Sequence, residues 1–163
     1  LPFMRLEMSR FIFREIFVKR KDWVIVANGS IARIFQSSPN DEKQWTELEC
    51  LLHPEGRLHG TDLAAGEIRH SIAGRAGLAR RLEPKQHARQ EFAQQVSDLL
   101  RHHLNLNEIG RLVIFASNPF LGELLGHLDG ETQKLLQASY PVDLTHLNLN
   151  ELMQRFSAEY KLG

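Results

Sequence analysis

The sequence predicts a single α/β domain in which one mixed β-sheet of about five strands packs with about four helices. The first half of the chain contains short β-prone runs separated by turn residues, which is typical of an antiparallel meander. The second half alternates segments of helical periodicity with apolar runs of strand length. The length of 163 residues suits one ordinary domain, and 42% hydrophobic and 25% charged residues are globular values.

The overall charge is balanced, with 20 Lys and Arg residues against 20 Asp and Glu residues. No global field therefore draws the protein toward nucleic acid or a membrane, and any such attraction must come from a local patch. No stretch reaches the roughly 18 apolar residues of a membrane span, and no export signal is recognisable. We expect a cytoplasmic protein.

Residues 1–22 form a basic and apolar N-terminal extension to the domain of residues 23–163. The segment mixes phenylalanine and isoleucine with arginine and lysine, so it could form an amphipathic helix on an anionic membrane. We favour an extension that packs against the domain, or sequence upstream of the true start, because Met4 and Met8 both lie inside it.

The first regular structure is a predicted hairpin of residues 23–27 and 30–35. Asn28 and Gly29 connect the two runs, and both residue types accept the positive φ angles of a type I′ turn. A third strand is expected from the alternation of residues 47–52, ending at His53. Cys50 lies inside this run, where we interpret it as a small core hydrophobe, and a single cysteine favours a reducing compartment.

Helices and strands alternate in the second half. The longest helix is expected from about Lys85 onward, with an apolar stripe through Phe92 and Val96. Residues 111–116 form an apolar run typical of a central strand, and Asn118 can cap the next helix with Pro119 at its first position. A short helix at 131–138, a strand at 140–144 and a last helix follow. The last of these can be capped by Thr145 or Asn148.

Residues 54–84 form a predicted loop far longer than the usual connection of roughly 4 to 6 residues. The loop is rich in glycine, which lets the backbone approach a partner, and in arginine, which pairs with phosphate through two hydrogen bonds. This combination suits a polyanion such as RNA, although a mobile loop with merely solvated arginines fits it equally. The candidate nucleic-acid-binding residues are Arg69, Gly74, Arg75, Arg80, Arg81 and Lys85.

No other motif specifies chemistry. The eight histidines have no established metal-ligand spacing, and no nucleotide-binding loop is present, so neither a metal nor a cofactor is expected. His53, His70 and His87 could form an acid–base group with Asp62 or Glu83 if the loop folds back. Of these, His70 and His87 are the candidate catalytic residues.

Three segments carry a family resemblance: Trp-Val-Ile-Val-Ala-Asn-Gly-Ser-Ile-Ala-Arg-Ile-Phe at 23–35, His-Pro-Glu-Gly-Arg at 53–57 and Asp-Leu-Thr-His-Leu at 143–147. The chain resembles the bacterial host attachment proteins, which in turn are similar to the central domain of archaeal and eukaryotic class 1 release factors and Pelota. That resemblance implies a mixed α/β sheet and a loop, before a long helix, that faces the ribosome.

In the release factors this loop carries Gly-Gly-Gln, which helps place a water against the peptidyl ester. The corresponding stretch here is 69–78, which keeps one glycine, Gly74, and has Arg75 where the glutamine would be. A charged arginine does not substitute simply for that glutamine. The resemblance therefore implies an RNA- or ribosome-facing loop more than it implies ester hydrolysis.

The favoured hypothesis is a non-enzymatic module that binds RNA or the ribosome. One alternative is an esterase acting on aminoacyl- or peptidyl-tRNA, with His70 or His87 as general base and Arg75 as electrostatic stabiliser. Another alternative takes the family description literally and makes the protein an adhesion or host-cell attachment factor. No export signal supports a partner on the host-cell surface.

Overall fold

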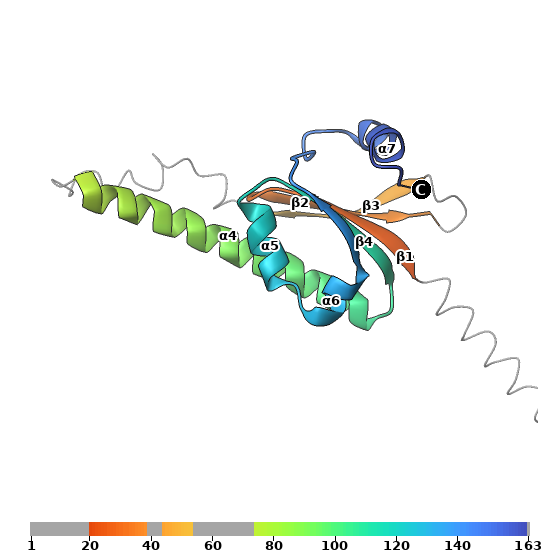
Figure 1. The fold of residues 1–163 in the computed structure, drawn as a ribbon, viewed down its shortest axis with the longest axis horizontal. Helices are drawn as coiled ribbons and strands as arrows, with labels where there is room; N and C mark the ends of the chain where they lie inside the picture. Colours follow the sequence, from red (N-terminus) through yellow and green to blue (C-terminus); the bar gives the residue numbers. More distant parts are fainter. Residues whose placement is uncertain (1–19, 39–43, 54–73, 163) are drawn as a thin grey trace, which may run out of the picture.

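A computed structural model describes residues 20–38, 44–53 and 74–162, except for the side chains of 74–83. It contains one five-stranded sheet in the order β3-β2-β1-β4-β5 (Figure 1). The strands are β1 (Lys21–Ala27), β2 (Ile31–Ser37), β3 (Trp45–Leu52), β4 (Ile109–Ala116) and β5 (Leu136–Tyr140). The helices are α4 (Gly74–Asn105), α5 (Phe120–His127), α6 (Gly130–Leu135) and α7 (Leu149–Ala158). The predicted class, one mixed sheet with helices, is confirmed.

The sheet is antiparallel on one side and parallel on the other. β1 pairs antiparallel with β2, and β2 pairs antiparallel with β3, as a hairpin meander requires. β1 pairs parallel with β4, and β4 pairs parallel with β5, because helices connect them. The carboxyl ends of β1, β4 and β5 therefore meet at one edge of the sheet.

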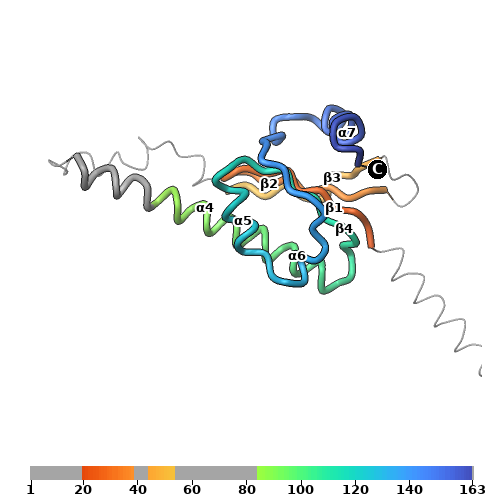
Figure 2. Tube along the Cα trace, in the orientation of Figure 1, coloured from red at the N-terminus to blue at the C-terminus, as the bar shows by residue number. Residues whose placement is uncertain are grey.

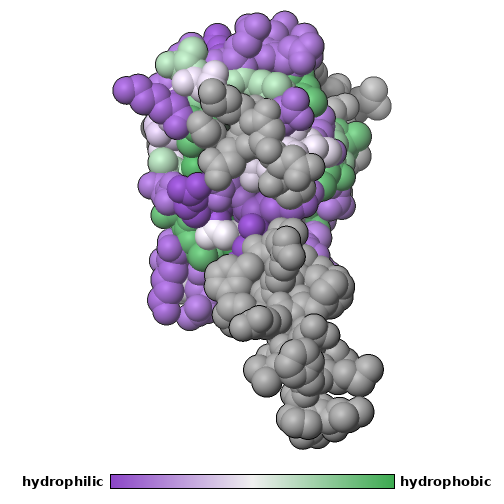
Figure 3. All heavy atoms as spheres, turned by 90° about the vertical axis from the view of Figure 1, so that its right-hand side faces the viewer, coloured by the Kyte–Doolittle hydropathy of each residue, from purple (hydrophilic) through white to green (hydrophobic). Residues whose placement is uncertain are grey.

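Two hydrophobic clusters occupy the two faces of the sheet. One joins alternate residues of β1 and β4, among them Ile25 and Ile114, to the apolar stripe of α4 and to α5. The other joins Val24 and Phe115 to Phe156 of α7. In Figures 1 and 2, α4, α5 and α6 accordingly lie on one face and α7 lies on the other. Viewed from the end where β1 begins, hydrophilic residues cover most of the coloured surface, with smaller hydrophobic patches between them (Figure 3).

The hairpin between β1 and β2 exists, but its predicted type I′ turn is wrong. Neither Asn28 nor Gly29 adopts a left-handed backbone conformation. Instead, Asn28 closes the turn with its side chain, whose Oδ1 accepts hydrogen bonds from the backbone N–H groups of Ser30 (2.9 Å) and Ile31 (3.0 Å). An asparagine side chain that mimics a backbone turn in this way needs no positive φ angle.

The third strand also differs from expectation, because Cys50 is exposed rather than part of the core. β3 lies at the edge of the sheet, and the residues from Thr46 to Cys50 are all exposed. Trp45 at its start is the one buried residue of the strand. The alternation of apolar residues in the sequence does not reveal that residues 46–50 of this strand stay exposed, whereas Trp45 packs on Phe156 of α7.

Helix α4 begins at Gly74, well before the expected start near Lys85. The stretch before Pro84 is composed mostly of alanine, leucine and arginine, which are strong helix formers. Their propensity outweighs the breaking effect of Gly77 and Pro84, so residues 74–84 of the predicted loop are helical. The rest of that loop, 54–73, lies outside the described residues, as does the N-terminal extension up to residue 19.

Smaller corrections concern the segment after β4. The expected capping of α5 by Asn118 is wrong, because α5 begins at Phe120 after Pro119 and has no side-chain cap; the N–H of Leu121 donates to the carbonyl of Ser117 instead. β5 ends at Tyr140, where the expected strand would have begun. Pro141 follows, and proline has no N–H to donate to the sheet.

Candidate nucleic-acid interface

Helix α4 extends past the carboxyl-end edge of the sheet (Figure 1). It runs antiparallel to β1: a Cβ atom at Gly29, after β1, would lie 3.7 Å from Cγ of Arg89, whereas the ring of His103 packs on Trp23 near the start of β1. Ala88 is the first buried residue among the described side chains of α4. At 1.5 Å per residue, about 21 Å of helix axis separates Gly74 from Ala88.

The part of α4 before its buried stripe is basic. Its first turn contains no acidic residue, so nothing there opposes the positive end of the helix dipole. The segment from Gly74 to Lys85 carries one acidic residue, Glu83, against four basic residues: Arg75, Arg80, Arg81 and Lys85. Lys85 is exposed. This composition makes the segment a local positive region in a chain of balanced charge.

The connection between β3 and α4 leaves the sheet beside α4 itself. The backbone N–H of His53 donates to the carbonyl of Ser30 in the hairpin turn at 2.8 Å. The ring of His53 is buried and stacks on Phe92 of α4, with ring centroids 5.2 Å apart and an interplanar angle of 16°. The turn after β1, the end of β3 and the middle of α4 are thereby held together.

A polar network joins the hairpin turn to the segment after β5. The Asn28 side-chain amide donates to Oδ2 of Asp143 (3.0 Å) and to Oγ1 of Thr145 (3.2 Å). Oδ1 of Asp143 accepts from both the N–H and the hydroxyl of Thr145, at 2.9 and 2.6 Å. Burial alone would raise the pKa of Asp143, but the hydrogen bonds from Thr145 and Asn28 hold this pKa below its ordinary value. The carboxylate is therefore ionised and fully engaged in holding the loop.

Arg33 of β2 fixes the other side of the same loop. Its guanidinium forms a two-point pair with Glu47 of β3, at 2.8 and 3.1 Å. It also donates to the backbone carbonyls of Thr145 (3.0 Å) and Leu147. The hydrogen bond with Glu47 raises the pKa of Arg33 above its ordinary value. Both networks position backbone and leave no reactive group directed outward, so their role is architectural.

Some of the predicted site residues lie outside the described residues, and the others lie on α4. Arg69 and His70 lie outside the described residues. Gly74, Arg75, Arg80 and Arg81 lie within α4 rather than in a loop. Because residues of a helix keep fixed spacings along its axis, these four residues hold fixed positions relative to one another along α4.

The proposed acid–base group is not assembled within the described part of the chain. His87 is exposed on α4, and its Nε2 lies 3.9 Å from Glu91 one turn later, while His53 is buried against Phe92. No group of three or more His, Cys, Asp or Glu side chains among the described residues could hold a metal ion. No described helix has the length and apolarity needed to cross a membrane.

The sequence does not predict that three residues, Asn28, Arg33 and Asp143, act together to hold one edge of the fold. Each lies in a segment that carries the family resemblance, but their contact depends on the order of strands in the sheet. The Asp-x-Thr spacing of Asp143 and Thr145 was the one local signal, since it permits an Asx turn.

A family model described as "Protein required for attachment to host cells" matches residues 23–156, from within β1 to within α7. The match covers all of α4 and the whole sheet except the first two residues of β1. None of the curated proteins matches the chain.

Proposed function

The chain belongs to the family of proteins required for attachment to host cells, and we propose that it is a non-enzymatic module that binds RNA, on the ribosome or free, through the basic N-terminal part of α4. The family description names a process and no molecular activity. The proposal supplies an activity that the chemistry of this helix supports.

The observation that carries the proposal is the charge of α4 before its buried stripe. Four of the twelve residues from Gly74 to Lys85 are basic and one is acidic. The segment also holds the helix N-terminus, whose free N–H groups and dipole favour phosphate. Guanidinium groups spaced along a helix suit a phosphate backbone, which repeats a negative charge at regular intervals.

The location supports the same proposal. In open α/β sheets, ligands bind outside the carboxyl ends of the strands. The basic part of α4 extends from that edge, next to the turn at Asn28. The alternative of an esterase receives no such support, because His87 is an exposed residue paired loosely with Glu91.

The test is binding of the purified full chain to ribosomes and to a structured RNA, measured by sedimentation and fluorescence anisotropy at several salt concentrations. The variant replaces Arg75, Arg80 and Arg81 by glutamine. The matched control replaces three exposed basic residues elsewhere by glutamine: Arg101, Lys134 and Arg155. Both variants lose three positive charges, so a difference between them reports location and not net charge.

We expect the α4 variant to bind at least tenfold more weakly at low salt, and the control to bind like the parent chain. The slope of log K against log salt should decrease in magnitude by about 2 in the α4 variant, because each lost phosphate contact removes about 0.7 to 0.9. Equal losses in the two variants, binding insensitive to salt, or no binding by the parent chain would each overturn the proposal.

A further inference from the structure

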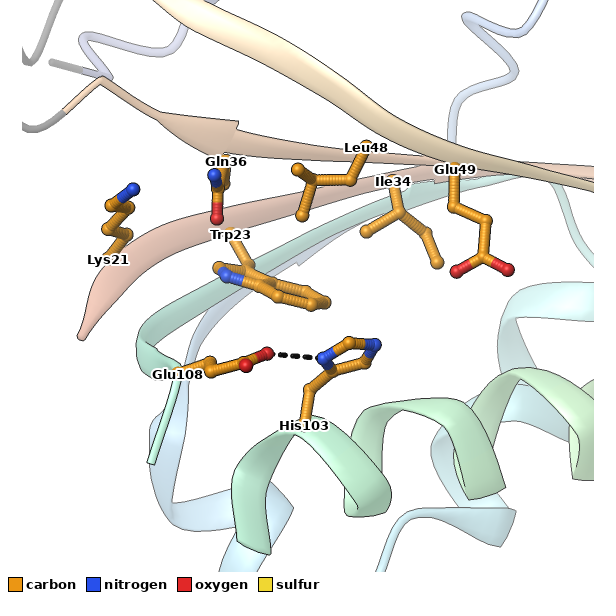
Figure 4. Close-up of a pocket in the computed structure, with 8 residues that line it drawn as sticks. All are labelled: Lys21, Trp23, Ile34, Gln36, Leu48, Glu49, His103 and Glu108. Atoms are coloured by element: carbon orange, nitrogen blue, oxygen red, sulfur yellow. Dashed lines mark hydrogen bonds and ion pairs between the residues drawn. The ribbon is translucent and has the colours of Figure 1, made fainter. Parts of the chain in front are cut away.

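A concave site lies at the opposite end of α4 from the basic segment. It is a pocket of about 460 Å³ between β1, β2 and β3 on one side and the last turn of α4 on the other (Figure 4). Trp23, Ile34 and Leu48 supply its apolar wall, and Glu49, His103 and Glu108 are polar groups around them. Mixed apolar walls with a few convergent polar groups are typical of small-ligand sites.

His103 is held in one orientation. Its Nδ1 forms a short hydrogen bond with Oε2 of Glu108, and the N–H of Glu108 donates to the carbonyl of His103 at 3.1 Å. The imidazole ring also packs on the indole of Trp23, with centroids 4.9 Å apart. A carboxylate at Nδ1 places the proton of the neutral imidazole on that nitrogen, which leaves Nε2 as a hydrogen-bond acceptor.

Nε2 of His103 faces another acceptor across the pocket. In Figure 4 this nitrogen points away from Glu108, on the side where the carboxylate of Glu49 descends from β3. Glu49 is exposed, and its carboxylate forms no hydrogen bond or ion pair with any other described residue. One donor placed between these two acceptors can bond to both, and a cationic donor meets both the charge of Glu49 and the lone pair of His103.

The apolar wall of the pocket combines a buried and an exposed side chain. Trp23 is 1% exposed, and its ring forms part of the wall. Leu48, in contrast, is a large apolar side chain that remains 42% exposed at the mouth of the same pocket. An alkyl chain that covers Leu48 removes this apolar surface from water.

We propose that this pocket binds a small organic cation, a primary alkylammonium. Its ammonium group donates to the Glu49 carboxylate and to Nε2 of His103, and its alkyl chain covers Leu48 and Ile34. Lys21 lines the far end of the pocket, so its charge directs the cationic group toward Glu49. The inference is independent of RNA binding by α4, because the two sites share no residue.

The test uses the indole N–H signals of the full chain in nitrogen–proton NMR spectra. The protein has two tryptophans, and a Trp45→Phe variant assigns the signal of Trp23. Trp45 packs against Phe156 on the α7 side of the sheet, so its signal is an internal control. The probes are n-butylammonium, butan-1-ol and butyrate, which share an alkyl chain and differ in charge.

We expect n-butylammonium to shift the Trp23 signal saturably at millimolar concentration while the Trp45 signal stays in place. Butan-1-ol and butyrate should shift neither signal. Glu49→Gln and His103→Phe should each weaken binding at least tenfold, and Glu91→Gln, which changes an exposed carboxylate elsewhere on α4, should not.

Glu49 is exposed on an edge strand, so Glu49→Gln is expected to fold, which the dispersion of its NMR spectrum checks. Equal shifts with butyrate, no shift with n-butylammonium, or unchanged affinity in a folded Glu49→Gln variant would overturn the proposal.

Discussion

Asn28 and Asp143 stand 115 residues apart in the sequence and are joined by a side-chain hydrogen bond of 3.0 Å. The same asparagine also closes the turn between β1 and β2 through its Oδ1 atom. One side chain therefore couples the first hairpin to the segment that follows the last strand. The stability of the carboxyl-end edge depends on this coupling.

Replacing Asn28 by alanine should lower the free energy of unfolding by about 1–3 kcal/mol, because it leaves turn N–H groups and part of the Asp143 carboxylate without partners. Urea unfolding followed by circular dichroism measures the change. Asn150→Ala, an exposed asparagine on α7, is the control and should stay within about 0.5 kcal/mol of the parent chain. Equal effects of the two substitutions would contradict the role of Asn28.

Asp143 should make the stability of the protein sensitive to acid. Its pKa is lowered in the folded state, so its stabilising contribution is complete above the ordinary value of 3.8 and is lost as the pH falls through the lowered folded pKa. The difference in unfolding free energy between the parent chain and Asp143→Asn should therefore be largest near neutral pH and shrink below about pH 4. Urea unfolding of both proteins at several pH values tests this, and a difference independent of pH would refute it.

Arg33→Lys should destabilise the fold by about 1–2 kcal/mol although the charge is kept. A lysine cannot hold both oxygens of Glu47 and also reach the carbonyls of Thr145 and Leu147. Arg155→Lys is the matched control, because Arg155 lies on α7 at 3.8 Å from Glu159, with a side chain 44% exposed. Thermal unfolding of both variants separates the effect of the guanidinium geometry from the effect of charge alone. Equal melting temperatures would argue against a role for that geometry.

Phe92→Ala should lower the free energy of unfolding by about 3–5 kcal/mol. Phe92 is fully buried and contacts the rings of both His53 and Phe120, at 5.2 and 5.5 Å between centroids. Leu106→Ala is the control, since Leu106 is 50% exposed and its truncation leaves no cavity. A small effect at Phe92 in denaturant unfolding would mean that α4 is held to the sheet by other contacts.

Local sequence patterns predict those elements of the fold that depend on residues nearby in the sequence. The runs at 23–27 and 111–116 contain enough β-branched residues to specify strands, and Asn148 caps α7 as expected. Asn148 and Glu151 form a capping box, whose spacing is visible in any sequence. These elements depend on neighbours within a few residues.

The errors arose where the outcome depends on distant contacts. Cys50 alternates like a core residue, yet it lies on an exposed stretch of the edge strand β3. Helix α4 begins at Gly74 and not near Lys85, because the helix propensity of residues 75–83 outweighs the breaking effect of Gly77 and Pro84. The contact of Asn28 with Asp143 follows from strand order alone, which no spacing in the sequence encodes.

Because α4 is long, a small change in how it packs on the sheet displaces its N-terminal end by a larger distance. Ala88, Phe92, Val96 and Leu100 hold the helix against the sheet, and the basic segment projects from that fixed portion. A tilt of α4 by only about 10° about Ala88 would displace Gly74 by about 4 Å, because about 21 Å of helix axis separates the two residues. The packing of a few buried side chains thus sets the direction of the helical segment that carries Arg75, Arg80 and Arg81.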